Sequence, residues 1–319
     1  MRNSWKRTVF CIGAAVFAAA ITGGRAFGKF STGDILLNNL SANDIQQFNS
    51  SGTLLQTFTG TGTLWEGASL TPGGNLVTTF RNPSAGVDIF SPDGTQVASF
   101  PIPQIQTASV GAGPSDVSVF PDGTLAIDSL NSTNVFEYAQ NGTYIRTLSV
   151  PGALNPFGNT VASNGTLWVA DVAGDQIFNL SEAGTLLETV GTTFEPSDLV
   201  VAGDGSLYVT GFRDGNVYHL SPTGAVLGEF SIGQYSDGIG LSPDGASLFL
   251  DATTGMDQYS TGGTSLYAFG INSISTPLFL TVVPAQVAVP EPASLGLLVA
   301  AIAGLSARRC RSPRFDLSN

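Results

Sequence analysis

Residues 165–184 read GTLWVADVAGDQIFNLSEAG and place two alternating segments, 166–170 and 176–180, between two glycines. Alternation of apolar and polar residues, with β-branched and aromatic members, is typical of half-buried β-strands. The glycines lie in polar turns, where glycine accepts the positive φ that other residues resist. The stretch therefore predicts a β-hairpin.

The same pair of glycines occurs six times along the chain. The first glycine of each pair opens a strand-like segment, at intervals of 41, 49, 42, 40 and 40 residues: Gly33, Gly74, Gly123, Gly165, Gly205 and Gly245. The second follows 18 to 20 residues later: Gly52, Gly94, Gly142, Gly184, Gly224 and Gly263. A unit of this length with about four short strands is one blade of a propeller, which must pack against neighbours around a ring. The sequence therefore predicts an all-β, six-bladed β-propeller of four-stranded antiparallel blades.

The ring also needs to be closed. The first repeat lacks an innermost strand before Gly33, whereas residues 277–283 are strand-like and follow the last repeat. We expect this segment to complete the first blade, so that the propeller spans residues 29–283. Residues 284–289 would then form a short linker to the C-terminal end.

Two of the units carry a recognisable local pattern. Residues 167–171 (LWVAD) with 175–178 (DQIF), and residues 207–209 (LYV) with 215–218 (GNVY), resemble NHL repeats, and the resemblance extends over roughly residues 35–271. It implies the propeller fold. Because propellers serve as binding modules, lyases, lactonases and scaffolds, it does not specify a function.

The N-terminal end is typical of a secretory signal peptide. Arg2, Lys6 and Arg7 precede an uncharged, apolar segment at 8–24, and small residues around Gly28 suit cleavage there. We therefore expect residues 1–28 to be a helical signal peptide. An uncleaved anchor is the alternative.

The C-terminal end has three parts. Pro290, Glu291 and Pro292 precede the apolar run 293–307, and a cationic cluster follows: Arg308, Arg309 and Arg311. The run is shorter than the roughly 20 residues that a stable transmembrane helix needs, so we expect a short helix that associates transiently with the membrane. A plain C-terminal anchor is the alternative.

The order of these parts resembles the PEP-CTERM sorting signal of Gram-negative bacteria, which in this chain would span residues 290–311 with a short tail at 312–319. The resemblance implies recognition by an exosortase, with cleavage near Pro290 to Pro292. It further implies export through the inner membrane of a Gram-negative-type bacterium to the cell surface or the extracellular matrix.

The charge of the body restricts its partners. Residues 29–307 contain 23 Asp and Glu against 4 Lys and Arg, a formal charge of −19. Nucleic acids and anionic lipids need clustered basic residues, so this body is not expected to bind them. Both cysteines, Cys11 and Cys310, lie in the segments expected to be removed, so no disulfide is expected in the propeller.

Candidate site residues are expected at the channel mouth, where inner strands begin. Eight positions before the strand-opening glycines lie Glu66, Ser115, Phe157, Ser197 and Asp237. The pairs Glu66-Gly67 and Asp237-Gly238 resemble the metal-ligand positions of the gluconolactonase family of six-bladed propellers. That resemblance implies a divalent cation such as Ca²⁺ held by Glu66 and Asp237. Alternates at the mouth are Ser115, Asp116, Asn159, Ser197 and Asp198.

Asp116 and Asp198 are one residue out of register, which in a regular strand turns a side chain to the opposite face. The family's asparagine is missing from the expected positions, and Ca²⁺ needs six to eight oxygens. The alternative is that the mouth acids are ordinary loop caps. Asp128, Asp171 and Asp251, at the ends of other strands, are expected to cap turns.

Two functions remain open. The first is a noncatalytic binding or scaffold module that recognises an unknown protein or glycan. The second is a metal-dependent lactonase-like or lyase-like enzyme with a cation in the central channel. No catalytic residue is identified, because His219 is the only histidine and no cluster of Cys or His is present in the body.

Overall fold

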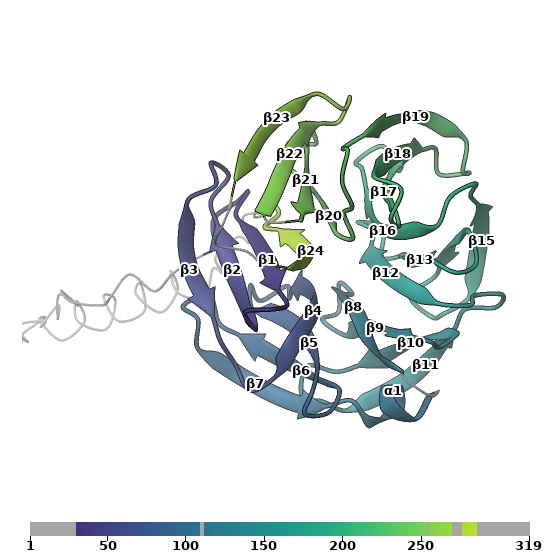
Figure 1. Cartoon of the computed structure of the whole chain (residues 1–319). Coiled ribbons are helices and arrows are strands. Elements are labelled where there is room, and N and C mark those ends of the chain that lie inside the picture. Colours follow the sequence, from purple (N-terminus) through teal and green to yellow (C-terminus); the bar gives the residue numbers. More distant parts are fainter. Residues whose placement is uncertain (1–29, 109–111, 254, 270–275, 286–319) are drawn as a thin grey trace, which may run out of the picture.

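The computed structural model describes residues 30–285, apart from 109–111, 254 and 270–275. These residues form 24 β-strands and one short helix, and the strands make six four-stranded antiparallel sheets. Figure 1 shows the sheets arranged as blades around a central axis. The prediction of a six-bladed propeller is therefore confirmed. The predicted signal helix and the C-terminal helix lie outside the described residues.

Within each blade the strands follow one another from the channel outward. Blade 1 contains β24 (Pro277–Val282), β1 (Ile35–Asn39), β2 (Asp44–Phe48) and β3 (Leu54–Phe58), and blade 2 contains β4 (Thr63–Leu70), β5 (Leu76–Asn82), β6 (Gly86–Phe90) and β7 (Gln96–Pro101). Blade 3 contains β8 (Gly113–Val119), β9 (Leu125–Leu130), β10 (Asn134–Tyr138) and β11 (Tyr144–Ser149), and blade 4 contains β12 (Pro156–Val161), β13 (Leu167–Asp171), β14 (Gln176–Leu180) and β15 (Leu186–Gly191). Blade 5 contains β16 (Pro196–Val201), β17 (Leu207–Gly211), β18 (Asn216–Leu220) and β19 (Val226–Ser231), and blade 6 contains β20 (Ile239–Leu241), β21 (Ser247–Ala252), β22 (Gly255–Ser260) and β23 (Ser265–Phe269).

The ring closes through the two ends of the propeller. β24 pairs antiparallel with β1, with Ile35 opposite Val282 and Leu37 opposite Leu280. The N–H of Gly33 also donates to the carbonyl of Val283 at 2.9 Å. In Figure 1 the yellow-green β24 lies beside the purple β1. The expected completion of the first blade by the segment after the last repeat is confirmed.

The hydrophobic core lies between neighbouring blades. The second strands of blades 1, 4 and 5 are buried along their whole length, so both faces of each pack against other side chains. Trp65 and Trp168 are 1% and 5% exposed and belong to this core. The repeated glycines adopt positive φ in the turns, for example 82° at Gly165, as the turn chemistry predicts.

A short helix, α1 (Pro103–Ala108), lies in the connection between blades 2 and 3. It accounts for the longest interval between repeats, 49 residues, and no pattern in the sequence indicated it. Ile105 of α1 is fully buried in the core shared by these two blades. No helix among the described residues is long and apolar enough to cross a membrane.

The strand directions define two faces. All inner strands begin at one face, which we call the mouth, and end at the other, which we call the base. Because adjacent strands are antiparallel, each outermost strand begins at the base. Phe30 and Ala285, the two ends of the described chain, line one cavity at the base together with the turns that follow β4 and β8. Both ends of the propeller therefore lie at the base.

Candidate functional site

Four of the five predicted mouth positions fall within β-bulges of the inner strands, and the fifth, Asp237, lies just before β20. In β4, β8, β12 and β16 the pairing register shifts between Trp65/Ala68, Pro114/Val117, Pro156/Gly158 and Pro196/Leu199. A bulge adds a residue to one strand and turns nearby side chains out of strict alternation. A count that assumes regular alternation therefore does not predict which way each of these side chains points.

Glu66 on β4 and Arg81 on β5 form an ion pair. Nη2 of Arg81 donates to Oε2 of Glu66 at 2.6 Å, and the two side chains are 35% and 3% exposed respectively. Burial raises the pKa of Glu66 to about 7, because the guanidinium of Arg81 offsets only part of the desolvation and Asp237 adds repulsion. Glu66 is thus engaged by a cation that the protein itself supplies.

Asp237 lies just before β20 and is half-buried. Burial raises its pKa, whereas a hydrogen bond from Ser197 and the charge of Arg213 lower it. The hydroxyl of Ser197 lies 3.2 Å from the carbonyl oxygen of Asp237 and 3.4 Å from its Oδ1. Arg213 also lies over the ring of Phe212, with 4.6 Å from Cζ to the ring centroid. Each mouth acid therefore has an arginine near it.

Phenylalanine rings close the channel at the mouth. Phe157 of β12 packs against Phe279 of β24 with 5.3 Å between ring centroids. These strands belong to blades 4 and 1, which lie opposite each other in a ring of six, so the contact spans the channel axis. Phe212 packs against Phe157 at 5.8 Å. A channel cavity of about 410 Å³ lies beyond the rings, toward the base.

The mouth residues do not fit the predicted calcium site. Among the described residues, no group of three or more His, Cys, Asp or Glu side chains is placed to hold a metal ion. Arg81 already binds Glu66, and the ring of Phe157 stands at one of the positions where further ligands were expected. Because Ca²⁺ needs six to eight oxygens, two acids and two hydroxyls fall short.

Asp116 and Asp198 join neighbouring blades instead of facing the mouth. Oδ2 of Asp116 accepts from the N–H of Asn159 in the next blade at 3.0 Å, and Oδ2 of Asp198 accepts from the N–H of Ile239 at 3.1 Å. In each case Oδ1 accepts from the N–H of the following residue. Burial raises the pKa of Asp116 to about 7 and that of Asp198 well above its usual range. We call these two residues the blade clasps.

Glycines make room for the blade clasps. A Cβ at Gly67 would lie 2.5 Å from Cα of Asp116, and one at Gly158 would lie 2.8 Å from Cα of Asp198. Blade 2 thus packs its backbone against blade 3, and blade 4 packs against blade 5, with a glycine facing an aspartate each time. The clasps and their glycines are structural elements of the ring.

Ser115 and Asn159 lie buried in the channel wall. Oγ of Ser115 and both polar atoms of the Asn159 side chain have no hydrogen-bond partner of standard geometry. The carboxamide of Asn159 lies near the carboxyl group of Asp128, whose pKa is raised well above its usual range by burial and by the charge of Asp116. The side chains of these two alternates therefore form no hydrogen bond with Glu66 or Asp237.

Two of the three aspartates expected to cap turns do so. The carboxylate of Asp171 accepts from the N–H groups of Leu154 and Asn155 at 2.8 and 2.6 Å. Oδ1 of Asp251 accepts from the N–H of Gly238 at 2.8 Å. Asp128 is the exception, since both of its oxygens lack such a donor.

His219 packs within blade 5. Its ring stacks on Tyr208 at 4.3 Å between centroids, and its Nε2 lies 2.9 Å from Oγ of Ser206. These contacts are those of a residue packed within its blade.

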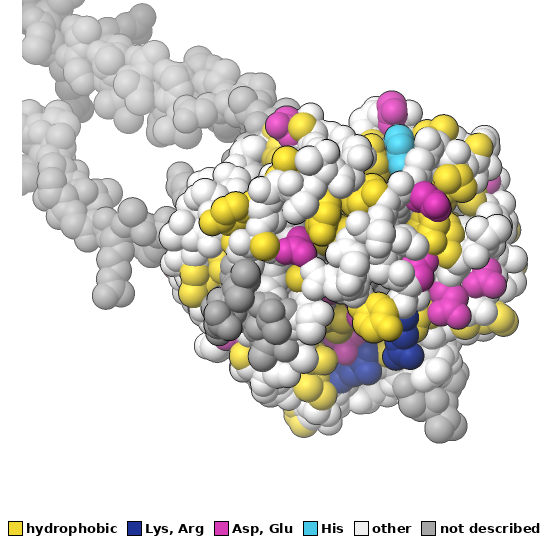
Figure 2. Space-filling view, turned by 45° about the horizontal axis from the view of Figure 1, so that its top comes forward, with side chains coloured by type: hydrophobic (Ala, Val, Ile, Leu, Met, Phe, Trp, Pro, Cys, Tyr) yellow, Lys and Arg dark blue, Asp and Glu magenta, His cyan; other side chains and the backbone are white. Residues whose placement is uncertain are grey.

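Sequence reasoning missed four residues of the mouth: Arg81, Arg213, Phe212 and Phe279. The arginines could have been found, because they are two of only four Lys and Arg in residues 29–307. Figure 2 shows Lys and Arg side chains lying close together among acidic and hydrophobic ones on one face of the propeller. Phe279 reaches the mouth through ring closure. The strand-like segment 277–283 predicts the closure, but no local pattern indicates that the ring of Phe279 meets that of Phe157.

Comparison with known proteins finds similarities for the C-terminal end of the chain and for the propeller. A family model described as the PEP-CTERM protein-sorting motif matches residues 288–311. The match includes the sorting residues named above, which lie outside the described residues. The motif implies processing by an exosortase, export across the inner membrane, and a surface or extracellular location.

Solved structures share the propeller fold at low identity. The chain is similar to a chain of a nidogen/laminin complex (16% identity, 80% of this chain and 99% of that chain, TM-score 0.65). It is also similar to streptogramin B lyase (17%, 80% and 86%, TM-score 0.60) and to a Bacteroides caccae protein of unknown function (12%, 80% and 100%, TM-score 0.61). No curated protein matches the sequence. At this identity the likeness shows the fold alone.

Proposed function

We propose that this chain, which combines an exosortase sorting motif with a six-bladed propeller, is a noncatalytic binding module. It is displayed on the surface of a Gram-negative-type bacterium or released into its extracellular matrix. The observation that supports this proposal is the contact between Phe157 and Phe279 across the channel axis. It makes the mouth a shallow surface, where a ligand can rest without entering the channel.

The chemistry of the mouth favours a neutral glycan as the ligand. Phe157 and Phe212 are partly exposed, and the C–H faces of sugar rings pack well on aromatic rings. Arg81 and Arg213 are accessible at the mouth, where each lies near a carboxylate. Such alternating donors and acceptors suit hydroxyl groups, which both donate and accept hydrogen bonds.

The test is binding of the chain to an array of neutral oligosaccharides. We expect Phe157→Ala to weaken binding at least tenfold, an order-of-magnitude estimate for the loss of one aromatic contact. Tyr144→Ala is the matched control, because Tyr144 is a partly exposed aromatic residue on the outer strand of blade 3. Equal binding by both variants would show that the glycan does not bind at the mouth. If the chain bound proteins and no oligosaccharide, the ligand would be a protein instead of a glycan.

The second candidate is a metal-dependent lactonase-like or lyase-like enzyme. The observation that favours it is the repulsion between Glu66 and Asp237, which a cation between them would relieve. In this candidate, Glu66 would have to release Arg81 and bind a metal ion. Further residues would have to supply the remaining metal ligands. Metal titration therefore separates the two candidates.

A further inference from the structure

A hollow of about 410 Å³ lies at the mouth face, between blades 5 and 6. It is lined by residues of three loops: Asp214, Gly215, Gly233, Gln234, Tyr235 and Thr253. The loops are the turn between β17 and β18, the connection from β19 to β20 and the turn between β21 and β22. Because adjacent strands are antiparallel and the inner strands begin at the mouth, all three loops lie at that face. We call this feature the side hollow.

The side hollow adjoins the residues of the mouth. Phe212 and Arg213 directly precede Asp214 in one loop, and Asp237 follows Tyr235 by two residues in another. Consecutive Cα atoms are about 3.8 Å apart, so the Cα of each of these mouth residues lies within about 8 Å of that of a lining residue. A ligand seated on the ring of Phe212 can therefore extend outward into the side hollow.

The turn that joins the mouth to the side hollow holds an unusual residue at a strained position. Arg213 has a φ of 60°. The other non-glycine residues with positive φ in turns between second and third strands are all Asn or Asp: Asn43, Asn131 and Asp175. Short polar side chains tolerate this conformation because they hydrogen-bond locally, and arginine lacks that advantage. Since such strain is retained where function uses it, the exposed Arg213 points to a binding role.

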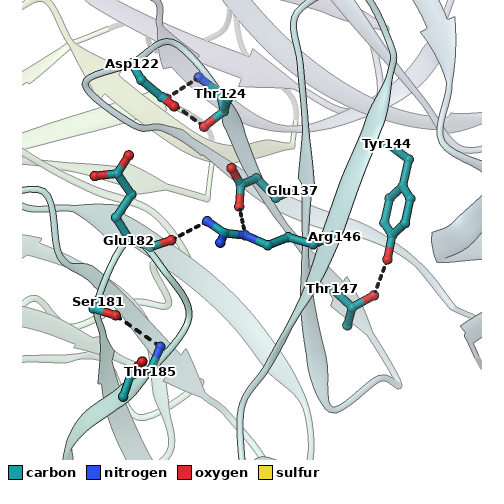
Figure 3. Close-up of polar contacts among 9 residues, drawn as sticks. All are labelled: Asp122, Thr124, Glu137, Tyr144, Arg146, Thr147, Ser181, Glu182 and Thr185. Carbon is teal, nitrogen blue, oxygen red and sulfur yellow. Dashed lines mark hydrogen bonds and ion pairs between the residues drawn. The ribbon is translucent and has the colours of Figure 1, made fainter.

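Tyr235 is the exposed aromatic residue of the side hollow. It is 63% exposed, and its side chain makes no hydrogen bond or ring contact with another described residue. Tyr144, on the outer strand of blade 3, differs in both respects. Figure 3 shows its hydroxyl directed at Thr147, with 2.7 Å between the two oxygens, and its ring packs on Tyr138 at 5.6 Å between centroids. The ring and the hydroxyl of Tyr235 are therefore free to contact a ligand.

The polar side chains of the side hollow are held in place by the protein. Oδ1 of Asp214 accepts from the N–H of Asn216, and its Oδ2 accepts from the hydroxyl of Tyr218, both at 2.8 Å. Nε2 of Gln234 donates to Oδ2 of Asp257. Each carboxylate oxygen of Asp214 keeps a further lone pair for an external donor. The carboxylate is thus fixed before a ligand arrives, which lowers the entropic cost of binding.

We propose that the side hollow is a second sugar-binding subsite, and that the ligand is a neutral oligosaccharide extending outward from the mouth. One sugar unit rests on Phe157 and Phe212, and a later unit packs its C–H face on the ring of Tyr235. Asp214 accepts from the hydroxyl groups of that unit, and Arg213 donates to the units between. The formal charge of −19 on residues 29–307 disfavours anionic sugars. This inference rests on the proposed function and adds the length and direction of the ligand.

The first test measures affinity against ligand length. Neutral glucose-, mannose- and galactose-based oligosaccharides of increasing length, from the monosaccharide upward, are titrated by calorimetry into the full chain, Tyr235→Ala and Tyr144→Ala. We expect the affinity of the parent chain to rise with length until the side hollow is filled. Tyr235→Ala should bind the shortest ligands as the parent does and the longer ones about fivefold more weakly. Tyr144→Ala should match the parent at every length.

The outcomes separate the subsite from the mouth. Equal affinities of the parent chain and Tyr235→Ala at every length would overturn the subsite and leave a glycan at the mouth in place. Equal losses for short and long ligands would also overturn it, because Tyr235 would then act on the first sugar unit or on the fold. If none of the oligosaccharides bound to the parent chain, the proposed function itself would be overturned, and the subsite with it.

The second test reports contact at the side hollow directly. Trp65 and Trp168 are buried, so the indole of Tyr235→Trp can be followed by its difference in emission from the parent chain. We expect a shift to shorter wavelength when a long oligosaccharide binds and none when a monosaccharide binds. Tyr144→Trp is the matched control and should show no shift with either ligand. Unchanged emission of Tyr235→Trp at a saturating concentration of the long ligand would overturn the subsite.

Discussion

Asp116 and Asp198 show that the position of a single side chain in this fold does not follow from strand periodicity alone. They are alternates for the mouth although they are one residue out of register with the mouth positions, and the structure places their carboxylates in the contact between blades, beside the bulges. The sequence contains the acids and their spacing. It does not indicate which of Ser115 and Asp116 is displaced by the bulge, because either one could be the extra residue. The blade clasps were therefore beyond sequence reasoning.

Buried aspartates make stability depend on pH. Burial raises the pKa of Asp251 from 3.8 to about 8, so the folded chain keeps a proton that the unfolded chain releases above pH 4. Stability is therefore fully present below about pH 4 and falls as pH rises through about 8. We expect Asp251 alone to contribute a loss of roughly 2–4 kcal/mol between pH 5 and pH 8.5, measured by urea denaturation.

Asp251→Asn isolates this contribution, because asparagine can still accept the bond from Gly238 but does not ionise. We expect a shallower dependence of the unfolding midpoint on pH in this variant. Asp244→Asn is the control, since Asp244 is exposed in a turn and its pKa is lowered by Ser242. An unchanged slope in Asp251→Asn would show that Asp251 is ionised in the folded state.

At the scale of elements, glycine positions allow the blades to approach each other. Alanine at Gly67 would place its Cβ 2.4 Å from the backbone nitrogen of Val117, and backbone cannot move aside easily. We expect Gly67→Ala to lower the free energy of unfolding by about 2–4 kcal/mol. Thermal or urea denaturation measures the change.

Gly228→Ala provides the matched control for this prediction. Gly228 also lies within a strand, β19, and a Cβ there would meet no atom within 4 Å. The change should stay within about 0.5 kcal/mol. If both substitutions lowered the free energy of unfolding equally, the close approach of blades 2 and 3 would not explain why a glycine is needed at position 67.

At the scale of the whole molecule, ring closure joins the end of the propeller to its start. Removal of the chain after Thr276 deletes β24 and leaves blade 1 with three strands. Removal after Ala285 keeps every strand. We expect the longer chain to unfold cooperatively and to resist trypsin and thermolysin, and the shorter one to be digested rapidly. Similar resistance of both would show that β24 is dispensable.

The sequence predicts the global architecture better than the mouth, for a physical reason. Six glycine pairs in fixed phase define six blades, and the strand-like segment at residues 277–283 indicates the closure. Contacts at the mouth join residues distant in sequence, such as Phe157 with Phe279, and depend on bulges. Glu66 and Asp237 were placed at the mouth, but the arginine beside each one was not foreseen.

The most direct test of a binding module without a metal centre is calorimetric titration of Ca²⁺ into the chain and into Glu66→Gln/Asp237→Asn. Because Arg81 neutralises Glu66 and Phe157 closes the channel, we expect no saturable heat in either protein. One stoichiometric site that is present in the parent chain and lost in the double variant would contradict a noncatalytic binding module and favour the metal-dependent enzyme.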